Sequence, residues 1–143
     1  MRKQFDYDTI QIGEVLGRQE ILISDEMIRT CANAIESSHP WYLEDSPFGG
    51  RIAPPTVFDN VSLNMLDEQY ERFGSIHAGQ AWAFEYPARL GKKVTVTVAI
   101  ADKFIRRERP YIVMELTAVD DEDITLCRGR HTSLMTLKKE VTS

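Results

Sequence analysis

Hydrophobic positions near the start of the chain recur with the period of a helix. Their spacing of i, i+3, i+4 and i+7 predicts a helix with one buried face. The residues at these positions are Ile28, Cys31, Ala32 and Ile35. Ser24 suits the N-cap and Pro40 prevents a continuation, so the predicted helix ends at about Glu36. A short strand is predicted just before it, at residues 18–23.

A second helical pattern follows a long loop at residues 37–54. Pro54 and Pro55 suit the first turn of a helix, because the amide hydrogen that proline lacks would have no partner there. Gly74 is typical of a helix end. We therefore predict one long helix from about residue 54 to about residue 73. Its apolar face comprises Val57, Phe58, Val61, Met65 and Leu66.

The second half of the chain alternates apolar and polar residues with the period of a β-strand. Strands are predicted at residues 75–87, 94–100, 111–119 and 124–137. A helix, a long helix and then an antiparallel meander indicate an α+β domain. A long apolar helix beside a curved meander further suggests that the sheet wraps around that helix. The length of 143 residues fits a single domain, residues 1–143.

Composition and charge narrow the class of protein. The chain has 17 lysines and arginines against 22 aspartates and glutamates, a formal net charge of −5, which argues against a nucleic-acid binder. Two cysteines, Cys31 and Cys127, are too few for a disulfide scaffold or a multi-cysteine zinc module. No apolar run approaches the ~20 residues that span a membrane. The acidic N-terminal segment does not fit a secretion signal, so we expect a cytoplasmic protein.

Two segments carry a resemblance to a known family. Residues 35–56 read IESSHPWYLEDSPFGGRIAPPT, and residues 77–100 read HAGQAWAFEYPARLGKKVTVTVAI. Both resemble the MaoC-type hydratase/dehydratase family, in which the second segment follows the pattern HAxQxxxxxxPxxxGD. The two segments together make up about a third of the chain, and their order is that of the family.

The resemblance implies a hot-dog fold, in which an antiparallel sheet wraps around one long central helix. It implies that water is added across, or removed from, the α,β-positions of an acyl-CoA or acyl-carrier thioester. The thioester is then the substrate, and no further cofactor is expected. The resemblance also implies a dimer, either with a second copy of the chain or with another hot-dog subunit, and a site at the interface.

The chain departs from the family's catalytic pattern at two places. The family motif resembles G-D-x-N-P-x-H, in which Asp and His are the acid/base pair. Aligning Pro40 with the motif proline places Ser37 at the aspartate position and Tyr42 at the histidine position. After GGxIA, the catalytic form carries His-Gly, and a backbone amide there faces the thioester oxygen. This chain has Pro54-Pro55, which have no N–H, so it resembles the non-catalytic half of paired hydratases.

Three nearby side chains are candidates for a replacement acid/base set: His39, Tyr42 and Glu36. Histidine titrates near neutral pH, but His39 also fits a loop residue with local hydrogen bonds, and Glu36 fits a solvated acid. His131 alternates within the last predicted strand and fits a structural role. No histidine has cysteines or acids at ligand spacing, so no metal site is expected. The candidate substrate-binding residues are Ser37, Trp41, Phe48, Gly49, Gly50, Ile52, Ala53, Thr56 and His77.

Three functions remain open from the sequence. The first is a hydratase/dehydratase acting on 2-enoyl or 3-hydroxyacyl thioesters with non-standard residues. The second is a non-catalytic subunit that binds the acyl thioester and completes a heterodimeric hydratase. The third is another acyl-thioester reaction such as thioester hydrolysis, because a fold does not determine its chemistry.

Overall fold

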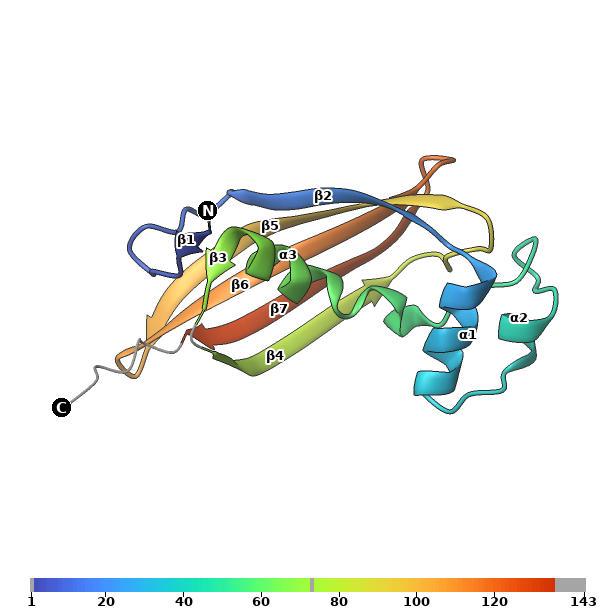
Figure 1. Ribbon diagram of the computed structural model, residues 1–143, viewed down its shortest axis with the longest axis horizontal. Helices are drawn as coiled ribbons and strands as arrows, with labels where there is room; N and C mark the ends of the chain where they lie inside the picture. The colour runs from blue at the N-terminus through green and yellow to red at the C-terminus, as the bar shows by residue number, and fades with distance from the viewer. Residues whose placement is uncertain (1, 73, 136–143) are drawn as a thin grey trace.

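The computed structural model describes residues 2–72 and 74–135, and its main feature is a five-stranded antiparallel sheet (Figure 1). The spatial order of the strands is β2–β5–β6–β7–β4. The four predicted strands and the short one before the first helix are all present. Their bounds are β2 Val15–Leu22, β4 Ser75–Phe84, β5 Lys93–Arg106, β6 Arg109–Asp120 and β7 Thr125–Met135.

Alternation builds the central strands as the sequence predicts. On β5, the side chains that face the core are buried, with exposed fractions of 1% or less, while the intervening positions are only half-buried. The buried residues are Val94, Val96, Val98 and Ile100. The strand continues beyond the predicted end to Arg106, where Arg107 and Glu108, both with positive φ, turn the chain into β6. Left-handed residues at both turn positions match the twist of a tight hairpin.

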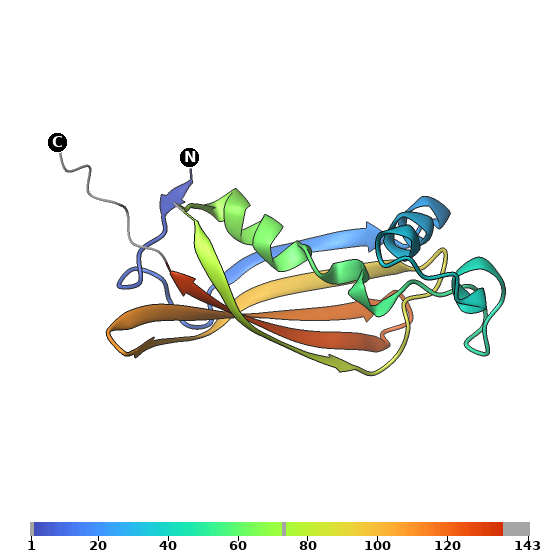
Figure 2. The same ribbon diagram turned by 90° about the horizontal axis from the view of Figure 1, so that it is seen from below.

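The helices lie on one face and at one end of the sheet (Figures 1 and 2). Ser24 caps α1 as predicted, because its hydroxyl oxygen accepts a hydrogen bond from the Met27 amide at 3.1 Å. Among the described residues, no helix is long and apolar enough to cross a bilayer. The remaining elements are α1 Asp25–Ala34, α2 Pro40–Leu43, the 3₁₀ helix η1 Pro55–Phe58, α3 Val61–Gln69, and the two-residue strands β1 Lys3–Gln4 and β3 Tyr70–Glu71, which pair in parallel.

The prediction of one unbroken helix from residue 54 to 73 is wrong. The segment consists of η1 and the nine-residue α3, with a break at Asp59 and Asn60. Aspartate and asparagine have low helix propensities and favour helix ends over helix interiors. The predicted helix end at about Phe73 is also wrong, because α3 ends at Gln69 and the next two residues form β3. The predicted end of the last strand at residues 136–137 lies outside the described residues.

The core lies between α3 and the inner face of the sheet. Met65 and Leu66 of α3 are 3% and 0% exposed and belong to the main hydrophobic cluster. A Cβ atom at Gly17 of β2 would lie 3.0 Å from the Met65 sulfur. The absence of a side chain at Gly17 therefore lets α3 approach β2 closely.

The inner face of the sheet is covered unevenly. Helix α3 packs against β2 and β6, whereas β4, at the opposite edge from β2, has no buried residue. Ile76 and Phe84 of β4 are 56% and 54% exposed. The edge strand therefore presents large apolar side chains, and no other strand of residues 2–72 and 74–135 pairs with its outer side.

Replacing Leu66 with alanine should lower the free energy of unfolding by about 2–5 kcal/mol, because the change leaves a cavity in a packed core. Urea unfolding followed by circular dichroism measures the loss. Leu22→Ala is the matched control, since Leu22 is 53% exposed, and it should change stability by less than about 1 kcal/mol. Equal losses in the two variants would show that α3 does not anchor the core.

Candidate functional site

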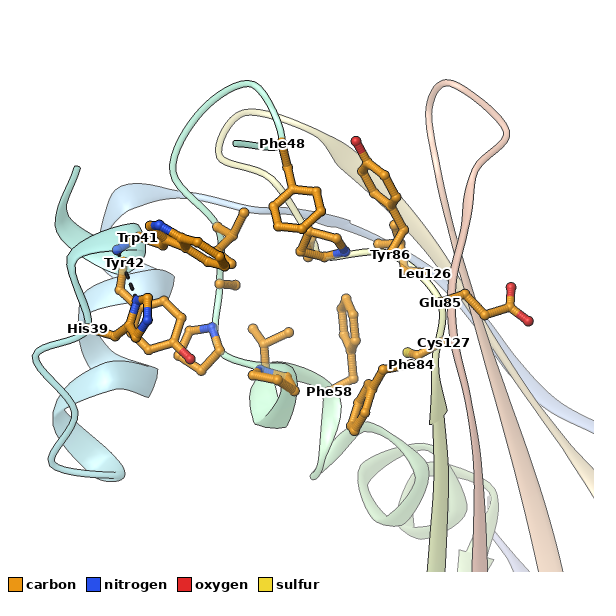
Figure 3. A pocket seen from close by; sticks show the side chains of 17 residues that line it. His39, Trp41, Tyr42, Phe48, Phe58, Phe84, Glu85, Tyr86, Leu126 and Cys127 are labelled. Atoms are coloured by element: carbon orange, nitrogen blue, oxygen red, sulfur yellow. Dashed lines mark hydrogen bonds between the residues drawn. The ribbon is translucent and has the colours of Figure 1, made fainter. Parts of the chain in front are cut away.

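A pocket of about 390 Å³ lies at one end of the sheet (Figure 3). Its walls come from the segment between α1 and α3, from the end of β4 and from the start of β7. The volume lies in the range of small-molecule sites, and the lining is mainly apolar and aromatic, as such sites usually are. The lining residues are His39, Trp41, Tyr42, Phe48, Ile52, Ala53, Pro54, Pro55, Val57, Phe58, Phe84, Glu85, Tyr86, Pro87, Ala88, Leu126 and Cys127.

The chain enters the pocket wall through a defined turn at the end of α1. Glu36 adopts a left-handed conformation with a φ of 53°. Its amide donates to the Asn33 carbonyl at 3.1 Å, and the Ser37 amide donates to the Ala32 carbonyl at 2.9 Å. This pair of bonds is a Schellman motif, which usually carries glycine at the left-handed position. The turn leads directly into α2, whose N-cap is His39.

Arg51 ties the pocket loop to α1. Its Nε donates to the Tyr42 carbonyl oxygen at 3.0 Å, and its Nη1 lies 2.5 Å from Oδ1 of Asp25. Hydrogen bonds from Arg51 and then from Arg29 lower the pKa of Asp25 below its usual range. Arg51 therefore fixes the shape of the loop by binding both the Tyr42 backbone within it and the Asp25 carboxylate of α1.

The opposite rim is the turn that follows β4. Phe48 bridges the pocket mouth, with its ring edge-on to Trp41 at 5.8 Å and to Tyr86 at 5.5 Å between centroids. Below the aromatic rings, the Ala53 amide donates to the Ala88 carbonyl at 2.8 Å. The two rims are therefore joined by both side-chain and backbone contacts.

An ionic network fixes this rim to the β6–β7 hairpin. Arg89 Nη2 lies 2.8 Å from Glu122 and 3.3 Å from Asp120, and Lys92 also pairs with Glu122. Hydrogen bonds from Lys92 and Arg89 lower the pKa of Glu122 to about 2. The Glu122 carboxylate therefore stays ionised, beside both cations, at pH values well below those at which a free glutamate is protonated.

His39 and Tyr42 both offer hydrogen-bond donors to the pocket. The Trp41 amide donates to Nδ1 of His39 at 3.2 Å, so in the neutral imidazole the proton must reside on Nε2. Burial, with a smaller effect of Cys31, raises the pKa of Tyr42, which keeps its hydroxyl protonated at neutral pH. Their ring centroids are 5.6 Å apart, and no described hydrogen bond joins the two side chains.

The pocket lining holds one carboxylate, and it faces away. Figure 3 shows the Glu85 side chain extending outward from the end of β4. Pro54 and Pro55 line the opposite wall and have no amide hydrogen to donate. Among the residues that line the pocket, we therefore find donors but no group poised to remove a proton.

Comparison with known proteins identifies the family. The profile of the FAS1-like dehydratase domain region matches residues 10–125, most of the chain. The chain belongs to this family of MaoC-like dehydratase domains. A search of curated proteins returns no match.

Solved structures show the same fold for this MaoC-like domain. An R-hydratase of Pseudomonas aeruginosa superimposes with a TM-score of 0.77 at 15% identity, covering 99% of this chain and 94% of its own. The HadBC 3R-hydroxyacyl-ACP dehydratase complex of Mycobacterium tuberculosis gives 0.72 at 19% identity, covering 87% and 96%. The ChsH1–ChsH2 complex of Mycobacterium tuberculosis gives 0.71 at 8% identity, covering 88% and 98%. These likenesses confirm the hot-dog fold.

The structure places six of the predicted MaoC-like site residues around this pocket: His39, Tyr42, Trp41, Phe48, Ile52 and Ala53. Glu36 is exposed at the end of α1 and does not line the pocket. The Ser37 hydroxyl accepts a hydrogen bond from the His39 amide at 3.3 Å. Gly49 and Gly50 form the loop tip, with φ values of 86° and 128°.

Thr56 lies outside the pocket, on a second groove between α1 and η1. Its hydroxyl is 3.3 Å from the Cys31 sulfur, and both residues line that groove. Among the described residues, no group of three histidine, cysteine or acidic side chains gathers as a metal site.

Sequence reasoning missed the contribution of β4 and β7 to the pocket. Phe84 ends β4 and Tyr86 follows it in the next turn, while Cys127 comes from β7 and Phe58 from η1. The alternation of Trp82, Phe84 and Tyr86 was a usable signal, because aromatic residues on one face of a strand mark a surface that contacts something.

His77 lies far along β4 from the pocket lining and stacks on His131, with centroids 4.1 Å apart and an angle of 13° between planes. A bulge between His77 and Gly79 places Gln80 within reach of the same ring. His131 Nδ1 is 3.1 Å from the Gln80 amide oxygen, and Nε2 is 2.8 Å from the Ser133 hydroxyl. His131 is 5% exposed, in agreement with the predicted structural role.

The buried His131 should make stability depend on pH. Burial first, then His77 and Arg72, lowers its pKa to about 4, whereas an unfolded histidine titrates near 6.5. Between these values the unfolded chain binds a proton that the folded chain does not, so stability should fall as pH drops from about 6.5 to about 4. Urea midpoints measured across this range test the effect. His131→Asn should flatten the slope, while His39→Asn should keep it; an unchanged slope in His131→Asn would contradict the assignment.

Proposed function

We propose that this chain is the acyl-binding, non-catalytic subunit of a hydratase or dehydratase for 2-enoyl or 3-hydroxyacyl thioesters. A hot-dog partner supplies the acid and base. The observation that carries this proposal is the apolar pocket that offers donors from His39 and Tyr42 but no base.

Hydration of an enoyl thioester requires a base to activate water, an acid to protonate the α-carbon and donors for the carbonyl oxygen. The Tyr42 hydroxyl and the Nε2 proton of His39 suit the last of these tasks. The Nδ1 lone pair of His39 is occupied by the Trp41 amide, so this imidazole lacks the free nitrogen that a base needs. The pocket therefore supports binding of the acyl thioester and leaves proton removal to another chain.

The edge strand β4 supports the partner. Within the part of the chain that the structure describes, β4 ends the sheet with one backbone side unpaired and with exposed Ile76 and Phe84. A second hot-dog sheet can pair there. Two structures with the same fold are described as complexes, HadBC and ChsH1–ChsH2 of Mycobacterium tuberculosis. The subunit that pairs with β4 is, in this proposal, a hot-dog chain with an intact Asp/His dyad.

The isolated chain should bind acyl-CoA without converting it. We expect calorimetry to detect a non-hydrolysable acyl-CoA thioether, and we expect no loss of enoyl absorbance when 2-enoyl-CoA is added. Phe48→Ala should weaken binding about tenfold, because it removes an aromatic wall. Glu36→Gln, on a side chain outside the pocket, is the control and should leave the affinity unchanged.

Other outcomes of the same assay decide between the remaining functions. If the chain alone hydrates the substrate and His39→Ala abolishes this activity, the chain is an autonomous hydratase. The position of His39 and Tyr42 in one pocket, with ring centroids 5.6 Å apart, favours this second candidate function. Release of free CoA thiol without hydration would indicate a thioesterase. Addition of a dyad-containing hot-dog subunit should produce hydration if the proposal is correct.

A charge on the outer edge of β4 should block assembly. Ile76→Lys places an ammonium group against the expected partner sheet, and we expect the dissociation constant to rise at least about tenfold. Ile105→Lys is the matched control, because Ile105 is 62% exposed on β5, which β6 and β7 separate from β4. Light scattering of the complex gives the mass of the assembly. Loss of assembly in both variants, or in neither, would place the interface elsewhere.

A further inference from the structure

The floor of the pocket is made by two facing elements. Phe58 of η1, 3% exposed, and Phe84 of β4, 54% exposed, both line it. Figure 3 shows both rings on the side of the pocket from which β4, β7 and α3 continue. Phe58 is held in the core, whereas Phe84 stands on the open edge strand. The position of the Phe84 ring, unlike that of Phe58, therefore depends on a neighbouring side chain.

Trp82 is that neighbour. Its ring stacks parallel to Phe84, with centroids 5.6 Å apart and 9° between the planes. It also lies flat over β7: a Cβ atom at Gly129 would be 2.5 Å from Cζ3 and 2.7 Å from Cε3 of the indole. The missing side chain at Gly129 makes room for the indole, because a Cβ atom there would displace it. Trp82 thus backs Phe84 directly without itself lining the pocket.

Beyond Trp82 the inner face of β4 and β7 becomes polar. The next pair along the two strands is Gln80 and His131, joined by the 3.1 Å hydrogen bond. An acyl chain that extended past Trp82 would contact the buried His131 imidazole and the Gln80 amide, which are already hydrogen-bonded to each other. Burial of CH₂ groups against this pair yields less free energy than burial in an apolar pocket.

We infer that Trp82 is a positioning residue that sets the maximum acyl-chain length, by holding Phe84 as the end wall of the pocket. The ligand class is a linear acyl chain, saturated beyond the carbons that react, that fills the pocket and stops at Phe84. The inference rests on the proposed acyl-binding function.

The test measures affinity against chain length for the full chain. Acyl-CoA thioethers with saturated chains of increasing even length are titrated by calorimetry. For the wild-type chain, each added CH₂ should tighten binding about fourfold until the chain reaches Phe84, and longer chains should gain nothing. In Trp82→Ala the plateau should move to longer chains. A chain two carbons past the wild-type plateau should bind about tenfold more tightly to the variant, while short chains should bind equally well.

A second variant and a matched control make the result specific. Phe84→Ala, at an exposed position of the edge strand, should move the plateau in the same direction and serves if Trp82→Ala does not fold. Phe104→Ala removes a ring from another stacked pair, Phe104 and Tyr111 at 5.0 Å on β5 and β6, and should leave the plateau in place.

The possible failures are distinct. A uniform loss of affinity at all lengths, or an unchanged plateau, in both Trp82→Ala and Phe84→Ala would overturn the inference and leave acyl binding intact. A wild-type chain that binds no thioether at any length would remove the proposed function, and the inference with it.

Discussion

The packing of a nine-residue helix against a five-stranded sheet is the constraint on which the rest of the structure depends. At about 1.5 Å per residue, α3 spans only about 14 Å, and it packs against β2 and β6. Gly17 lets it come close to β2. The β7–β4 side of the same face must therefore be filled by other groups. These are the pocket at one end, Trp82 over Gly129 in the middle, and the stacked His77 and His131 beyond.

The segment between α1 and α3 that lines the pocket is held rigidly, and it offers hydrogen-bond donors but no free base. Arg51 ties it to α1 through the Asp25 carboxylate and the Tyr42 carbonyl, and two prolines stiffen its exit. The same segment places His39 as a helix cap, which uses the nitrogen that a general base would need. The segment therefore keeps its shape while the backbone occupies Nδ1 of His39, and this combination supports the proposal of a subunit that holds an acyl group for a partner.

Much of the fold could be predicted, because local rules act strongly there. The Ser24 cap and the alternation from Val94 to Ile100 were sufficient to predict α1 and the start of β5. The break at Asp59 and Asn60 was missed, since the apolar spacing across it is equally compatible with one continuous helix. The site was predicted only in part: the loop side, including His39 and Trp41, follows from motif spacing, whereas the strand side does not.

The sequence by itself determined the class of fold and the family, because these depend on residue type and spacing along the chain. The tertiary structure alone decided which side chains meet. Phe58 and Phe84 line one pocket although they are 26 positions apart, and Trp82 lies over Gly129 from a different strand. The protonation of His131 likewise depends on burial and on His77. Such contacts arise from strand register and helix placement, which many distant residues set together.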